Sequence, residues 1–219
     1  MRQPKTNNQK PKTRKALGLI ETLAAMGLLV MAVTPLMSMV ISAGASRTSN
    51  EYMTVAANLA REGIEVVVAK RNNNWINDAA FDAGMYIGSG ATSDYTFGLA
   101  FDPASSTWSF VNNPSGGAPS MITDALANVY MYTSGANAGL MVQGTVAVPQ
   151  PAGTSATKYS RLVTLDAVCW DGSIETIATS NSDCGANTKI GVRITSMVQW
   201  PDKGQNHNIS AVETIYDWR

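Results

Sequence analysis

The stretch TLAAMGLLVMAVTPLMSMVISAGAS, residues 22–46, contains 25 residues and no charged side chain. As a helix rising about 1.5 Å per residue it would be about 37 Å long, which exceeds the roughly 30 Å of bilayer hydrocarbon. The stretch therefore predicts a single membrane-spanning helix near the amino terminus.

The charges outside this stretch are distributed unevenly. Residues 1–16 carry 6 Lys and Arg and no acid, whereas residues 17–219 carry 10 basic and 16 acidic groups, so a net charge of zero divides into +6 and −6. The positive-inside bias places the basic block in the cytoplasm and the body of the chain on the other side. Because a phosphate backbone is bound by clustered Lys and Arg, the acidic body argues against nucleic-acid binding.

The composition also narrows the possible chemistry. One histidine, His207, and two cysteines exclude a His-rich metal centre and a four-cysteine zinc site. No nucleophile motif accompanies His207, which is expected to face solvent. The sequence therefore predicts no metal, no cofactor and no enzymatic activity.

A cleavable secretory signal is the main alternative for the apolar stretch. Ala43-Gly44-Ala45 has the small-x-small pattern of a cleavage site, and a cut after Ala45 would release a β-rich binding protein. Against it, the apolar run is longer than a signal core of roughly 7–15 residues. The run also contains Pro35 and has Glu21 at its entrance.

Glu21 is the most informative residue of this segment. A carboxylate at the bilayer centre costs roughly 2.5–3.5 kcal/mol on insertion scales, and less near the membrane surface, where Glu21 is expected. Glu21 either lies in the headgroup region beside Lys15 or meets a cationic group within the membrane.

The segment from Lys15 to Leu23, KALGLIETL, resembles the prepilin leader junction of type IV pilins and pseudopilins. The resemblance implies that a membrane aspartyl peptidase, the prepilin peptidase, cuts between Ala16 and Leu17 and that Leu17 is then N-methylated. Ala16 stands where the family usually has Gly, and Leu17 where it usually has Phe. A cut after Gly18 would leave Glu21 only third in the mature chain instead of fifth.

The resemblance further implies how such a chain assembles. In the family, the α-amino group of one subunit meets the glutamate of its neighbour, so Glu21 would fix the register between subunits. The precursor would lie in the inner membrane and join other pilin subunits at an inner-membrane assembly platform with its ATPase. The product is a surface pilus, with this chain as a minor subunit, or the periplasmic pseudopilus of a secretion system.

A second helical segment is expected directly after the apolar one. Apolar and small residues recur here at steps of three or four, which predicts one apolar face that packs on a sheet. These residues are Tyr52, Val55, Ala56, Leu59, Gly63, Val66 and Val67. The helix is thus predicted over residues 17–71, spanning the membrane at 17–46 and amphipathic at 47–71, with Asn72-Asn73-Asn74 as its stop signal. Pro35 is expected to kink it, with Thr34 bonding back to a freed carbonyl.

The remainder, residues 72–219, is predicted to be a β-rich head after a 1–16 leader, which gives an α+β, pilin-like fold with an antiparallel sheet. Turn residues are dense between short β-branched or alternating runs, and Pro201–Gln205 is predicted as a hairpin loop. Strands are predicted at Tyr95–Phe101, Thr107–Phe110, Val129–Tyr132, Gly144–Val148, Tyr159–Val168, Ile174–Ser180, Lys189–Trp200 and Asn208–Trp218.

Cys169 and Cys184 are separated by 14 residues in the body predicted to be exported. Export favours a disulfide, which would close a loop and contribute roughly 3 kcal/mol through the unfolded state. Two free thiols in a reducing environment are the alternative. Pilins often have a carboxyl-terminal loop bounded by a disulfide, so the position agrees with the resemblance.

Overall fold

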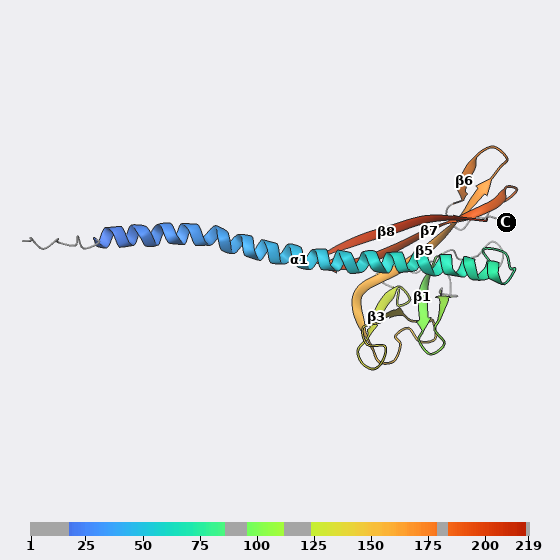
Figure 1. Cartoon of the computed structure of the whole chain (residues 1–219), viewed down its shortest axis with the longest axis horizontal. Helices are drawn as coiled ribbons and strands as arrows, with labels where there is room; N and C mark the ends of the chain where they lie inside the picture. Colours follow the sequence, from blue (N-terminus) through green and yellow to red (C-terminus); the bar gives the residue numbers. More distant parts are fainter. Residues whose placement is uncertain (1–17, 86–95, 112–123, 179–183, 218–219) are drawn as a thin grey trace, which may run out of the picture. The chain divides into compact units, whose positions relative to one another are not determined.

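The computed structural model describes residues 18–85, 96–111, 124–178 and 184–217 (Figure 1). These residues form one helix, α1 (Leu19–Ile76), and eight strands. The strands are β1 (Thr96–Asp102), β2 (Thr107–Val111), β3 (Asn128–Tyr132), β4 (Met141–Gln143), β5 (Thr154–Trp170), β6 (Glu175–Ala178), β7 (Thr188–Asp202) and β8 (Gln205–Tyr216). The predicted α+β fold class is confirmed.

The chain divides into two compact units, Met1–Thr48 and Ser49–Arg219, which are described separately. In the first, α1 continues through Pro35. The hydroxyl of Thr34 donates to the carbonyl of Val30 at 2.8 Å, which is the expected type of back-bond. The carbonyl that Pro35 leaves without a donor is that of Met31, four residues earlier, so the Thr34 bond does not replace the missing one.

In the second unit, the remaining part of α1 packs on one face of the sheet through the predicted apolar stripe. Ala56, Leu59, Ala60, Gly63, Ile64, Val66 and Val67 are buried, while Tyr52 and Val55 are half-buried. They meet core side chains of β1, β3, β5, β7 and β8 in two clusters. The sheet therefore completes the core that this face of the helix requires.

The helix ends at Ile76, beyond the predicted limit of residue 71 and the predicted stop at Asn72-Asn73-Asn74. Asp78 adopts a left-handed conformation with φ 55°, and Ala79 N donates to Asn74 O at 2.9 Å, which closes the last turn. The Asn74 side chain is buried and donates to the carbonyls of Phe81 and Ala83 at 3.0 and 2.9 Å. Asn74 thus holds the following segment against the helix.

The sheet is mixed and has the strand order β2-β1-β4-β3-β5-β7-β8, with β6 paired to β5. The pairings are antiparallel except for β1 with β4, which is parallel. The 17-residue β5 pairs with β1, β3, β6 and β7, so it is the strand that connects the two sides of the sheet.

Two sequence-based expectations about strands and turns need correction. The strand predicted at Gly144–Val148 is a turn, in which Thr145 N donates to Val148 O at 2.9 Å, and the actual strand β4 precedes it. A β-carbon at Gly144 would collide with the carbonyl of Pro149, so the chain folds back on itself here. The hairpin loop predicted at Pro201–Gln205 is only two residues long, Lys203 and Gly204, both with positive φ as a type I′ turn requires.

Candidate functional site

The apolar segment of α1 has no partner for its side chains among the described residues of the first unit, 18–48. Fourteen large apolar side chains between Leu19 and Ile41 are exposed, among them Leu19, Ile20, Met31 and Ile41 at 79, 82, 76 and 72%. Among the described residues, α1 is the helix long and apolar enough to cross a membrane. Such a surface is stable in lipid or against other apolar helices and unfavourable in water.

Glu21 lies in the first turn of α1 and is exposed. Its backbone N–H donates to Gly18 O at 2.8 Å, and its carboxylate has no ion pair or hydrogen bond within the described residues. The carboxylate is therefore available to a group from outside this part of the chain. The predicted cleavage and methylation residues, Ala16 and Leu17, and the alternative partner Lys15 lie outside the described residues.

The helix also continues through the alternative cleavage site. Ala43, Gly44 and Ala45 are helical, and the hydroxyl of Thr48 donates to Gly44 O at 3.2 Å. A peptidase that cuts the backbone needs an extended chain, so cleavage after Ala45 would require this part of α1 to unwind.

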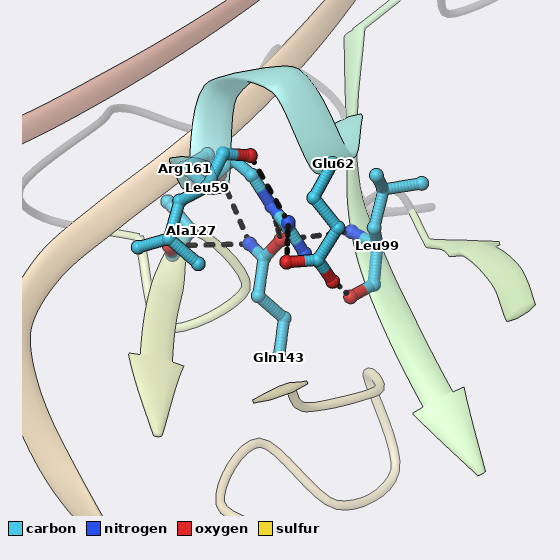
Figure 2. A network of polar contacts seen from close by, with 6 residues as sticks. All are labelled: Leu59, Glu62, Leu99, Ala127, Gln143 and Arg161. Atoms are coloured by element: carbon cyan, nitrogen blue, oxygen red, sulfur yellow. Dashed lines mark hydrogen bonds and ion pairs between the residues drawn. The ribbon is translucent and has the colours of Figure 1, made fainter. Parts of the chain in front are cut away.

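The head contains a buried charged residue that the sequence analysis did not identify, Arg161 of β5. Its side chain is 1% exposed and lies between α1 and the sheet (Figure 2). It donates to the side-chain carbonyl of Gln143 at 2.8 Å and to Leu59 O on the helix at 3.3 Å. Glu62, on the next turn of α1, lies 3.4 Å from the guanidinium and supplies the opposite charge.

Burial lowers the pKa of the Arg161 guanidinium, and the charge of Glu62 opposes this shift. Glu62 is itself 32% exposed, so the ion pair lies at the boundary between core and solvent. A buried cation without its acceptors would cost several kcal/mol, so the pair and its hydrogen bonds must form together. Arg161 therefore joins the helix to the sheet.

Gln143 of β4 organises the sheet around this arginine (Figure 2). Its side-chain oxygen accepts from Leu99 N at 3.1 Å as well as from Arg161. Its side-chain nitrogen donates to the carbonyls of Leu126 and Ala127 at 2.9 and 3.2 Å, and to the carbonyl of Arg161 at 2.9 Å. The short strand β4 ends at Gln143, and the side-chain amide of this residue bonds to the backbone of both β1 and β5.

The sequence contains one signal for this centre. Tyr159, Arg161, Val163 and Leu165 alternate along β5, so they share one face of the strand. Three of these side chains are apolar, which places Arg161 on the core side. The role of Gln143 has no comparable signal, because β4 is only three residues long.

The remaining predicted features are placed as follows. Cys169 and Cys184 form a disulfide, which confirms the predicted pair. His207 is exposed and stacks on Trp200 with ring centroids 5.8 Å apart. Within the described ranges, His, Cys, Asp and Glu form no cluster that could hold a metal ion.

No protein-family model, curated protein or solved structure matches this chain.

Proposed function

We propose that this chain is a structural subunit of a type IV pilus-like filament, a minor pilin held in the membrane as a precursor and assembled through α1. The observation that carries the proposal is the exposed apolar segment Leu19–Ile41 with a single carboxylate, Glu21, in its first turn. Lipid covers this surface before assembly, and neighbouring helices cover it afterwards. The basic residues 1–16 keep the amino terminus in the cytoplasm and send the head outward.

Processing between Ala16 and Leu17 creates a cation that can pair with Glu21. The new α-amino group of one subunit pairs with Glu21 of its neighbour in the apolar interior of the filament. In such surroundings an unpaired carboxylate is strongly penalised, so the pair fixes the axial register more than it adds net stability. The head contributes the outer surface of the filament, with the Arg161 centre and the disulfide holding its strands together.

The test is incorporation of a Glu21→Ala variant into filaments. We expect the variant to insert into the membrane and to be processed normally, because the apolar segment is unchanged, and to be largely missing from filaments sheared off the cells. Glu65→Ala is the matched control, since Glu65 is an exposed acid on the same helix beyond the apolar segment. Normal incorporation of the Glu21 variant would refute the register role.

The mass and first residue of the mature protein test the processing step. We expect a chain that begins at methylated Leu17, and we expect Ala16→Leu to leave a precursor 16 residues longer. A product that begins at Ser46 and leaves the membrane would identify a secreted protein instead. In a deletion strain, loss of surface fibres indicates a pilus, and loss of protein export indicates a pseudopilus.

A further inference from the structure

Strand β2 forms one end of the sheet, and no strand of the described residues pairs with its outer edge. It is the first strand in the sheet order, and within the described residues it pairs only with β1, from Gly98↔Val111 to Asp102↔Thr107. In an antiparallel pair, alternate residues point their N–H and C=O groups away from the partner strand. The outer edge of β2 is therefore a template for one more strand.

A groove with a volume of about 450 Å³ follows this edge. It is lined on one side by Thr107, Trp108, Ser109 and Phe110, four consecutive residues of β2. Because consecutive side chains point to opposite faces of a sheet, a groove that touches all four runs along the strand's edge and not over one face. An extended chain in the groove would lie beside the free backbone groups.

The other wall of the groove is one face of α1. This wall consists of side chains spaced three and four residues apart, which places them on one side of the helix. They are Val66, Ala69, Lys70 and Asn73. Val66 is buried and Ala69 is small, so the groove has an apolar base with polar groups towards its rim.

Lys70 gives the groove its charge. Its side chain is half-buried, and it has no hydrogen bond or ion pair with any residue that the structure describes. Its Nζ lies 3.5 Å from the position that a β-carbon at Gly84 would take, so the absence of a side chain there leaves the ammonium group open. Asp82, two residues earlier, is already bonded to Lys189 Nζ at 2.8 Å.

The aromatic side chains of β2 are held in place by the core. Phe110 stacks on Phe97 with ring centroids 4.5 Å apart, and Trp108 packs against Phe101 at 4.9 Å. Both Trp108 and Phe110 adjoin the main core cluster. The wall of the groove is therefore preformed.

We infer that this groove binds an extended peptide segment of a partner protein, which adds to β2 as a further strand and places an acidic side chain or terminal carboxylate against Lys70. The backbone hydrogen bonds of β2 supply affinity, and the groove with its lysine supplies specificity, as in other cases of strand addition. The inference concerns only the second unit, Ser49–Arg219, and holds whether or not the chain forms filaments.

The probes are seven-residue fluorescent peptides of alternating threonine and valine, with glutamate, glutamine or lysine at the centre. Their binding to the full chain in detergent is followed by fluorescence anisotropy. We expect the glutamate peptide to bind about fivefold more tightly than the glutamine peptide, as for a partly exposed ion pair. We expect Lys70→Glu to reverse this order in favour of the lysine peptide. Lys203→Gln, which changes an exposed lysine in the β7–β8 turn, should change nothing.

A glutamate peptide methylated on alternate backbone nitrogens tests the strand pairing separately. We expect at least one of its two alternating methylation patterns to abolish binding, because the methyl groups remove the donors that face β2. If both methylated forms bind as tightly as the unmethylated peptide, the groove takes a small amphiphile or a side chain alone, and the inference is overturned. Absence of binding by all three peptides, or an order of affinities unchanged by Lys70→Glu, would overturn it as well.

Discussion

Gln143→Leu is expected to destabilise the head strongly, although the two side chains have similar volume. The replacement removes the acceptor of two buried donors, Leu99 N and Arg161 Nε. It also removes a donor from the carbonyls of Leu126 and Arg161. Each buried group left without a partner costs about 1–3 kcal/mol, and more when it is charged. The carbonyl of Ala127 also loses its bond from Gln143, but it keeps a hydrogen bond from Arg161 N at 2.8 Å, so its contribution to the loss of stability is smaller. Four such groups add up to a loss of at least about 4 kcal/mol, a large part of the stability of an ordinary domain.

The assay is thermal unfolding of the full chain in detergent, followed by tryptophan fluorescence. For a domain of this size, a loss of about 4 kcal/mol lowers Tm by on the order of 10 °C. Gln150→Leu is the matched control, because Gln150 is exposed and its side chain makes only one bond, to Thr154 O at 2.9 Å. We also expect Gln143→Leu combined with Arg161→Met to cost less than the sum of the two changes, since the second removes a charge that the first leaves unpaired. A Gln143→Leu variant within about 1 kcal/mol of the unmodified chain would refute the reasoning.

Three further changes test the packing, the disulfide and the ionisation of the head. Gly63→Ala should lower the free energy of unfolding by about 1–3 kcal/mol, because its β-carbon would collide with the side chain of Ser196. The same change should lower it by less in a chain that already carries Ser196→Ala. An equal loss with and without Ser196→Ala would contradict this reason. Replacing Cys169 and Cys184 by Ala should lower the free energy of unfolding, measured in urea, by about 3 kcal/mol, the value expected for a loop closed by cysteines with a sequence separation of 15. Reduction of the disulfide in the unmodified chain should produce the same loss. Burial raises the pKa of Tyr159 to about 12, above the ordinary value of about 10, so the stability that its neutral form contributes below pH 10 should be lost between about pH 10 and 12. Tyr159→Phe should reduce this loss, measured as the free energy of unfolding in urea at several pH values. An unchanged loss in the variant would contradict the assignment to Tyr159.

Local patterns in the sequence predict the helix and the long carboxyl-terminal strands. The run of residues 22–46 is uncharged throughout, and the stripe from Tyr52 to Val67 is periodic over four turns. In β7, buried residues alternate with less buried ones from Val192 to Trp200. In patterns of this length one face of the element is buried, so the local preference of the residues and their packing in the fold favour the same secondary structure. The helix end is less predictable, because Asn74 bonds to Phe81 and Ala83 across a turn that a local pattern does not reveal.

The arrangement around Gln143 depends on contacts between distant parts of the chain. β4 lies between β1 and β3 and is only three residues long, too short to show alternation, whereas the β-branched run at Gly144–Val148 looks more like a strand and is a turn. Nothing near Gln143 in the sequence indicates that its amide will meet Leu99 or Arg161. Arg161 itself was predictable as an exception, being a charged residue on the apolar face of β5.

The contacts of Gly63 and Arg161 have a mechanical consequence for the helix within the head. Gly63 lies against Ser196 without room for a side chain, and on the helix Arg161 bonds to the carbonyl of Leu59, so both contacts mark the same axial position of α1 on the sheet. Sliding the helix by one turn, about 5.4 Å, would break both at once and bury bulkier side chains against Ser196. Tension applied along this part of the helix would therefore pass directly into β5 and β7 instead of being relieved by slippage.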